Sequence, residues 1–280
     1  MKEKTYETPS GVIRYWTGSK AEKARPQLVF LPGLGADHRL FEKQIVFFEG
    51  KYPVFVWDPP GHAGSWPFRF DFDLMDTAKW LREILALEGF EDPILVGQSM
   101  GGYTAQAFAE LCPERIRGFV SIDSAPLGRE YVSGLEIWLL KRTEPVYRYY
   151  PWKSLLRSGT NGVSVTEYGR KLMHEMMSVY EGQKERYAKL SGHGSRILAE
   201  AMEAGLAWKI PCPALLICGE KDHAGSAKRY NRKWHEKTGI PLGWIPDAGH
   251  NANTDAPDTV NNLIGEVISE AEKETAVRRK

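Results

Sequence analysis

The sequence lacks long apolar segments and has no excess of charge of either sign. No apolar run approaches ~18 residues, the length that spans a bilayer, and the polar start from Met1 to Thr5 is not followed by the apolar part of a signal peptide. The 37 Lys and Arg residues nearly balance 36 Asp and Glu residues, so the formal net charge is +1. This balance does not favour nucleic acid or an anionic membrane as a partner. We predict a cytoplasmic protein that binds neither.

Few residues suit a metal or a cofactor. The cysteines, Cys112, Cys212 and Cys218, are odd in number and form no C-x-x-C pair, which favours free thiols in a reducing compartment. The 7 histidines show no metal-ligand spacing. A Gly33-Leu34-Gly35 turn lacks the third glycine of a dinucleotide site, and the lysine motif of a phosphate loop is missing. We therefore predict no cofactor and no metal.

Short apolar segments recur along the chain and alternate with amphipathic segments of helical length. Such strands, apolar throughout, are typical of a parallel sheet that is buried on both faces. The sequence thus predicts an α/β fold with a mostly parallel central sheet flanked by helices, and with residues 12–16 in an antiparallel edge hairpin. The expected strands are 27–31, 54–57, 93–96, 118–122, 214–218 and 242–245, and the expected helices are 74–87, 103–111, 227–237 and 259–271.

This alternation stops between residues 125 and 208. The segment is aromatic and helical in character, and it leaves the predicted sheet after one strand and returns before the next. A structureless loop of that length is improbable. We predict a helical cap at 125–208, inserted in a core of residues 1–124 and 209–280. The alternative is a separate helical core unrelated to the site described next.

A serine between small residues follows the predicted strand 93–96 and precedes a helix. It lies in the segment Gly97-Gln98-Ser99-Met100-Gly101-Gly102. Glycines allow strand and helix to approach closely in such a turn, and the helix N-terminus favours a developing negative charge. Ser99 is therefore a candidate nucleophile, the alternative being an ordinary helix N-cap.

A serine nucleophile needs a base and an acid that orients the base. Asp222 follows the predicted strand 214–218, and His250 follows the strand 242–245. Functional groups in open α/β sheets gather at the carboxyl ends of the strands, so these three residues are expected to converge.

The three segments, Gly97 to Gly102, Gly219 to Asp222 and Asp247 to His250, resemble the catalytic segments of the α/β-hydrolase family. Two more segments resemble that family: Leu31-Pro32-Gly33-Leu34-Gly35, like its oxyanion loop, and Asp58-Pro59-Pro60-Gly61-His62, like its D-x-P-G-H turn. The resemblance implies the α/β-hydrolase fold with a cap. It also implies Ser99 as nucleophile, Asp222 as acid, His250 as base, and the backbone N–H groups of Leu34 and Met100 as oxyanion donors.

Other residues compete for these roles. Asp123 also ends a predicted strand and is an alternative acid, although we expect it to be a turn or helix-cap carboxylate. His38 and His62 should lie near the site, with His62 fastening its turn, whereas we expect His193 and His223 to be solvated.

A serine nucleophile predicts a serine hydrolase with an acyl-enzyme intermediate, most simply a carboxylesterase for small to medium, largely apolar esters. We expect Trp138 and Tyr147 to line an apolar substrate pocket with few charges. The alternatives are a carbon–carbon hydrolase, a lactonase, an aminopeptidase that uses Glu136, Glu144 or Glu167 to bind an amine, and a ligand-binding receptor or interaction protein on the same fold.

Overall fold

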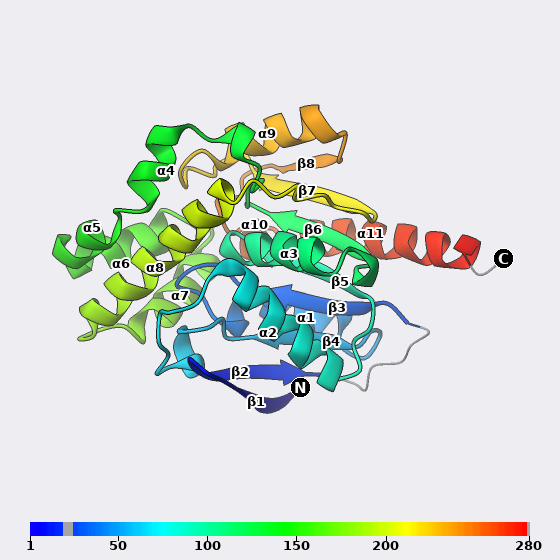
Figure 1. Cartoon of the computed structure of the whole chain (residues 1–280), viewed down its shortest axis with the longest axis horizontal. Helices are drawn as coiled ribbons and strands as arrows, with labels where there is room; N and C mark the ends of the chain where they lie inside the picture. Colours follow the sequence, from blue (N-terminus) through cyan, green and yellow to red (C-terminus); the bar gives the residue numbers. More distant parts are fainter. Residues whose placement is uncertain (19–24, 279–280) are drawn as a thin grey trace.

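The computed structural model describes residues 1–18 and 25–278. Within them, eight strands form one sheet in the order β1-β2-β4-β3-β5-β6-β7-β8 (Figure 1). β1 and β2 form an antiparallel hairpin and β2 pairs antiparallel with β4, whereas all later neighbours are parallel. The strands are β1 (Lys2–Thr8), β2 (Gly11–Thr17), β3 (Gln27–Leu31), β4 (Val54–Trp57), β5 (Pro93–Gln98), β6 (Gly118–Ile122), β7 (Ala214–Gly219) and β8 (Leu242–Ile245).

The central strands are buried on both faces because helices cover the sheet on either side. Successive residues of β3 alternate between two apolar layers. Val29 belongs to the layer that includes residues of α2 (Leu74–Leu87), α3 (Met100–Leu111) and α9 (Ala227–Thr238), and Phe30 belongs to the layer that includes residues of α1 (Glu42–Phe48) and α11 (Pro257–Arg278). Both side chains are fully buried. The predicted α/β architecture, a mostly parallel central sheet flanked by helices, is confirmed.

The predicted elements agree with the observed ones except near their ends. The helix 74–87 and the strands 118–122 and 242–245 have the predicted bounds, while β5 and β7 continue into the turns that follow them. β1 was missed because a charged edge strand with one solvated face has no apolar run. Short 3-10 helices complete the described part of the core: η1 (His38–Phe41), η2 (Ala63–Ser65) and η3 (Pro113–Arg115).

Between β6 and β7 the chain forms a group of helices at one end of the sheet, the end toward which the arrow of β3 points (Figure 1). This segment does not make an isolated core. Met176 of α7 packs in the layer beneath one face of the sheet, and Ile197 of α8 packs in the layer on the other. The segment comprises η4 (Arg129–Tyr131), α4 (Gly134–Leu140), α5 (Glu144–Tyr149), α6 (Trp152–Asn161), α7 (Glu167–Ser178) and α8 (Lys184–Glu203).

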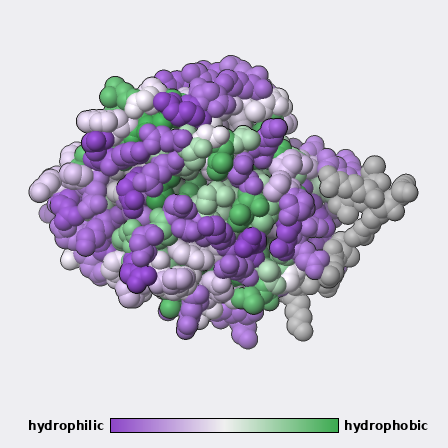
Figure 2. Space-filling view, viewed as in Figure 1, coloured by the Kyte–Doolittle hydropathy of each residue, from purple (hydrophilic) through white to green (hydrophobic). Residues whose placement is uncertain are grey.

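The surface seen in Figure 2 is mostly hydrophilic, with apolar side chains interspersed. Exposed large apolar residues concentrate on α4 and α5, where Leu135, Trp138 and Tyr149 are 67%, 51% and 80% exposed. Among the described residues, none of the helices combines the length and apolarity required to cross a bilayer.

A close backbone approach joins α3 to the sheet. A Cβ atom on Gly101 would overlap the carbonyl oxygen of Leu31 at the end of β3. We expect Gly101→Ala to lower the free energy of unfolding by about 1–3 kcal/mol, because overpacking forces the backbones apart. Gly265→Ala in α11 is the matched control, since its Cβ meets no atom within 4 Å. Alanine there should be neutral or stabilising by up to about 1 kcal/mol. Urea unfolding of both variants checks this, and equal stabilities would contradict it.

Candidate active site

Ser99 occupies a strained position between β5 and α3. Its φ of 50° lies in the left-handed region, which costs a non-glycine residue about 1–3 kcal/mol. The Ser99 N–H donates to the carbonyl of Ile122 at 2.9 Å, which holds the turn against β6. The side chain makes no capping hydrogen bond to α3. The hydroxyl is therefore not used as an ordinary N-cap.

The loop after β3 lies against this turn. A Cβ on Gly33 would come within 3.0 Å of the Ser99 Cβ, so only glycine fits there without displacement. Leu34, from this loop, and Met100, the first residue of α3, line the same cavity as Ser99. The first N–H groups of a helix have no partner within the helix, and they lie at the positive end of its dipole. The backbone around Ser99 thus suits an anionic group.

A partly buried histidine, His250, pairs with a buried carboxylate, Asp222, beyond the ends of β8 and β7. The His250 Nδ1 lies 3.0 Å from the Asp222 Oδ2, and Asp222 is 2% exposed. The other Asp222 oxygen accepts from the N–H of Ala224 at 2.7 Å. Because a carboxylate accepts, Nδ1 carries the proton, and Nε2 is left as a base.

Burial alone would lower the pKa of His250. The hydrogen bond from its ring to Asp222 and the charges of Asp222 and Asp123 outweigh that effect, so the pKa lies above the ordinary value of 6.5. The pair therefore stabilises the imidazolium form that a general base passes through.

Asp123 lies beside this pair but is not hydrogen-bonded to His250 in the structure. Its oxygens accept from the backbone N–H groups of Gly219 at 2.7 Å and of Ala252 at 3.1 Å. It thereby ties together the loops that carry Asp222 and His250. Burial raises the pKa of Asp123, the charge of His250 opposes that rise and the charge of Asp222 adds to it.

Two further polar residues, which sequence reasoning missed, hold the His250 loop. The Gln98 Nε2 donates to the His250 carbonyl at 2.9 Å and to the Asn251 Oδ1 at 3.0 Å. Asp255, in α10 (Ala252–Asp255), accepts from the Gly249 N–H at 2.9 Å and from the residues 164–166 that precede α7. For Gln98, the sequence offered one clue to this role, its position directly before Ser99.

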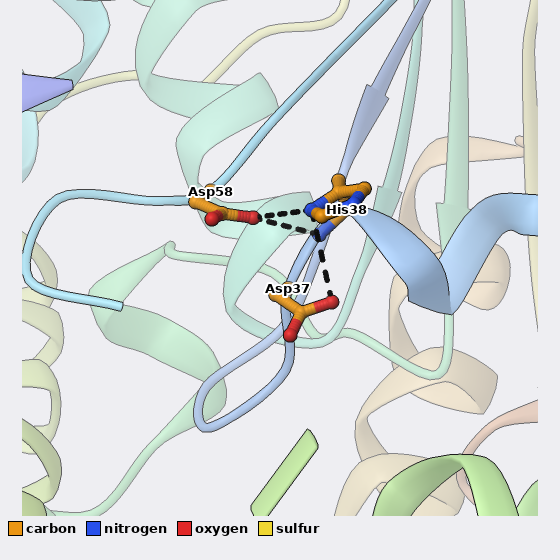
Figure 3. Close-up of side chains that lie close together, drawn as sticks. All are labelled: Asp37, His38 and Asp58. Atoms are coloured by element: carbon orange, nitrogen blue, oxygen red, sulfur yellow. Dashed lines mark hydrogen bonds and ion pairs between the residues drawn. The ribbon is translucent and has the colours of Figure 1, made fainter. Parts of the chain in front are cut away.

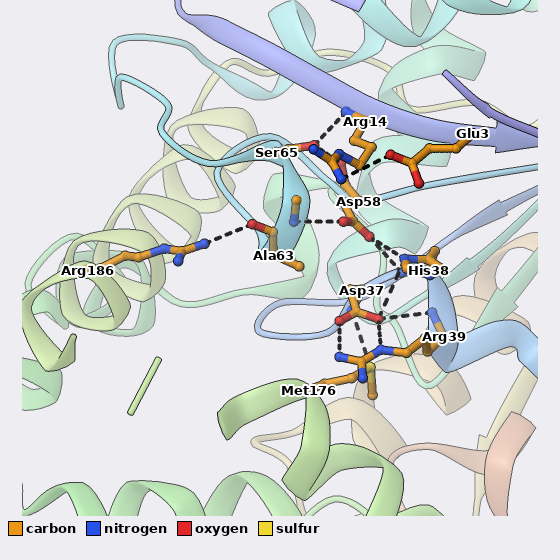
Figure 4. A network of polar contacts seen from close by, with 11 residues as sticks. Glu3, Arg14, Asp37, His38, Arg39, Asp58, Ala63, Ser65, Met176 and Arg186 are labelled. Atoms are coloured by element: carbon orange, nitrogen blue, oxygen red, sulfur yellow. Dashed lines mark hydrogen bonds and ion pairs between the residues drawn. The ribbon is translucent and has the colours of Figure 1, made fainter. Parts of the chain in front are cut away.

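His38 does not line the cavity with Ser99. Its Nδ1 lies 2.8 Å from the Asp58 Oδ1 (Figure 3). The other Asp58 oxygen accepts from the Gly64 N–H at 2.8 Å, and the His38 ring stacks on Trp16. Arg39 pairs with Asp37 in the same network (Figure 4). The D-x-P-G-H turn and the loop after β3 are thereby joined through Asp58.

A cavity of about 520 Å³ contains Ser99 and His250 on its floor and is lined by residues of α4, α5 and α8. Tyr147 lines this cavity. Trp138 does not: its ring packs under Arg142, and Glu136, Leu139 and Leu140 are the residues of α4 that line the cavity. The prediction for Trp138 was wrong because an amphipathic pattern does not say which face of a short helix turns inward.

Glu136 brings a carboxylate into this cavity, but its charge is already paired. Arg229 donates to it at 2.7 Å, and Tyr230 and Ser133 also donate. Burial favours the neutral acid, but these donors outweigh it and lower the pKa of Glu136 to about 2. Glu144 and Glu167 do not line the cavity.

His193, which was expected to be solvated, is only 5% exposed, because its ring packs against Phe70 and Phe72. His62 is also buried, and its Nδ1 lies 3.1 Å from the Pro60 carbonyl, which agrees with a fastening role in its turn. His223 is exposed.

Within the described chain, two groups of neighbouring side chains are of the types that can bind a metal ion. The possible ligand atoms of Asp37, His38 and Asp58 lie within 4.8 Å of one another, and so do those of Asp123, Cys218 and Asp222. The carboxylates of both groups are already engaged with backbone N–H groups, Arg39 or the two histidines. The donor sets are therefore accounted for without an ion.

Proteins similar to this chain include an enol-lactonase in sequence and an esterase in fold. The chain is 26% identical over 267 residues to 3-oxoadipate enol-lactonase 2 of Acinetobacter baylyi, covering 91% of this chain and 92% of that protein. Among solved structures, a thermophilic esterase from Thermogutta terrifontis has a TM-score of 0.68 at 19% identity, covering 97% of this chain and 100% of that one. The enol-lactonase from Burkholderia xenovorans LB400 has a TM-score of 0.70 at 18% identity, covering 95% and 100%. The Alpha/beta hydrolase family profile matches residues 28–263. The chain belongs to the alpha/beta hydrolase family.

Proposed function

We propose that this protein is a serine hydrolase that forms an acyl-enzyme on Ser99 and cleaves small to medium, largely apolar carboxylic esters. The observation that carries this proposal is the arrangement around one cavity: an uncapped serine hydroxyl on a strained turn, and a histidine paired with a buried carboxylate. A lactone is the second candidate substrate, because an enol-lactonase is similar to this chain over most of its length.

In the proposed mechanism, the Ser99 Oγ attacks the carbonyl carbon while the His250 Nε2 takes its proton. Asp222 holds the imidazolium, and the N–H groups of Leu34 and Met100 donate to the oxyanion. The intermediate collapses, the C–O bond to the alcohol breaks, and His250 gives the proton to the departing alkoxide. Water then attacks the acyl-enzyme by the same route. With a lactone, the departing alkoxide stays attached to the acyl group.

We also propose that the segment 125–208 acts as a cap that selects the acyl group. Support comes from the side chains of Leu140, Tyr147 and Leu198, which belong to α4, α5 and α8 and line the cavity over Ser99. The paired state of Glu136 argues against an amine-binding site and hence against an aminopeptidase.

The first test is Ser99→Ala. Loss of the nucleophile should lower kcat for p-nitrophenyl butyrate on the order of 10⁶-fold and abolish labelling by a fluorophosphonate, because the other groups cannot form an acyl-enzyme. Ser269→Ala, an exposed serine of α11, is the matched control and should keep both properties. Activity retained by the Ser99 variant would disprove the nucleophile assignment.

The second test separates the two acids. Asp222→Asn should lower kcat roughly 10⁴-fold, because the amide favours the wrong tautomer of His250. Only neutral His250 is a base, so kcat/KM should rise with pH through its pKa. In the wild type the midpoint should lie above pH 6.5, since the folded pKa is raised, and in the variant it should fall.

Asp123→Asn is the comparison for that test. This substitution should lower kcat far less than Asp222→Asn, because the Asp123 carboxylate contacts backbone donors rather than His250. It should lower the stability of the fold, because the NH₂ group of the new amide would face a backbone N–H group. Reversed effects of the two substitutions on kcat would assign the acid to Asp123.

The third test concerns the cap. Each methylene of an acyl chain that becomes buried contributes about 0.8 kcal/mol, so kcat/KM should rise with chain length until the cavity is full. Leu198→Ala should move the optimum to longer chains. Trp138→Ala should leave it in place, because Trp138 lies outside the cavity. Identical length profiles for the wild type and both variants would show that α8 does not bound the acyl site.

A further inference from the structure

A second, smaller cavity of about 40 Å³ lies next to the cavity that contains Ser99. The two cavities share Leu34 and Met100, the residues proposed to supply the oxyanion donors. Gly194 of α8 packs on the same two side chains: a Cβ there would be 3.0 Å from the Leu34 Cδ1 and 3.2 Å from the Met100 Cε. Two flexible side chains therefore form the partition between the cavities. Most of the remaining wall is apolar, including Pro32, Phe72 and Ile197.

Three residues of this wall carry buried nitrogen atoms that have no hydrogen-bond partner in the described part of the chain. They are the Nε1 of Trp57 and the Nε2 atoms of His62 and His193, on residues that are 1%, 5% and 5% exposed. The hydroxyls of Thr77 and Thr104, which also line the cavity, donate to backbone carbonyls. Leaving a buried polar group unpaired costs about 1–3 kcal/mol, so three around one cavity need an explanation.

The hydrogen bonds of the other ring atoms fix what each histidine offers. The His62 Nδ1 faces the Pro60 carbonyl at 3.1 Å, and a carbonyl only accepts, so Nδ1 carries the proton and Nε2 is an acceptor. The His193 Nδ1 lies 2.8 Å from the Arg196 guanidinium, which only donates, so its Nε2 carries the proton and is a donor.

Both rings are neutral. Burial lowers the pKa of His62 to about 4, and burial together with the charge of Arg196 lowers the pKa of His193 to about 3. The residues that line the cavity therefore include one unpaired acceptor, on His62, and two unpaired donors, on His193 and Trp57, in apolar surroundings.

We propose that this cavity is a subsite for a hydroxyl group on the acyl part of the substrate, which deepens and rests on the serine hydrolase function proposed above. A hydroxyl donates one hydrogen bond and accepts others, so it satisfies His62 together with His193 or Trp57. A ketone oxygen leaves His62 unpaired, and an ammonium leaves both donors unpaired. A volume of 40 Å³ exceeds the ~10–15 Å³ that one water needs, so a hydroxyl and the carbon that carries it fit.

The test compares p-nitrophenyl hexanoate with its hydroxyl-substituted forms, the hydroxyl being placed in turn on carbons 3 to 6. At one position the wild type should prefer the hydroxy ester about 10-fold or more in kcat/KM, since two hydrogen bonds are gained in an apolar cavity. A ratio of one or less at every position, with hydrolysis that depends on Ser99, would overturn the subsite and leave the hydrolase function standing. The cavity would then hold only solvent.

Variants of the two histidines identify the atoms involved. His193→Asn keeps an acceptor for Arg196 but loses the Nε2 donor, and His62→Asn keeps a donor for Pro60 but loses the Nε2 acceptor. Both should bring the hydroxyl preference close to one, and His193→Gln, which places an amide N–H where Nε2 lies, should restore part of it. His174→Asn, on the exposed face of α7, is the control and should leave the ratio unchanged. A preference that persists in both Asn variants would assign the hydroxyl to another site.

Binding to Ser99→Ala gives a readout without turnover. Calorimetric titration with the preferred hydroxyhexanoate and with hexanoate should show tighter binding of the hydroxy acid, and His193→Asn in the same background should remove the difference. This measurement stands even if Ser99 proves not to be a nucleophile, so failure of the subsite and failure of the hydrolase function are distinguishable. Equal binding of the two acids would overturn the subsite.

Discussion

The active-site geometry depends on the close approach of three backbone segments: the end of β3, the end of β5 and the first turn of α3. Gly101 lies against the Leu31 carbonyl, and Gly33 lies against Gln98 and Ser99, so no side chain separates the segments. This packing forces Ser99 into a left-handed conformation. The same contact brings the loop of Leu34 beside the N-terminus of α3. Ser99, the proposed nucleophile, and the backbone proposed to bind the oxyanion are thus positioned by one constraint. The strain at Ser99 is offset by the packing of the sheet and helix around it.

Buried polar side chains fix the rest of the site across loops that are distant in sequence. Asp123 accepts hydrogen bonds from the backbone of two loops, and Asp255 accepts one from the turn before His250. Gln98 donates to the carbonyl of His250. Each such group is hydrogen-bonded, so its net contribution to stability is modest, but its removal leaves buried donors unpaired and costs more. The loops that carry Asp222 and His250 are therefore held by polar contacts, whereas the sheet is held by apolar packing.

The strands could be predicted because their apolar runs are continuous, and Ser99, Asp222 and His250 could be placed because each directly follows such a strand. Their convergence required only parallel strands. Asp123 was recognised at a strand end, but its bond to Ala252 depends on a loop 129 residues away. The predictions that Trp138 lines the pocket and that His193 is solvated failed for a related reason. Which face of a helix in the inserted segment points inward depends on the helices around it, and the helix's own sequence pattern does not determine it.

The two cavities differ in whether the polar atoms of their walls have hydrogen-bond partners in the protein. The carboxylates that line the larger cavity, Glu136 and Asp123, are hydrogen-bonded to other groups of the protein. Around the smaller cavity, three nitrogen atoms have no partner among the described residues, although apolar residues of similar shape would fill the space without that cost. In the proposed subsite, a ligand hydroxyl completes these hydrogen bonds and recovers the cost when it binds. The partition of Leu34 and Met100 then joins recognition of that group to the backbone on which the oxyanion would form.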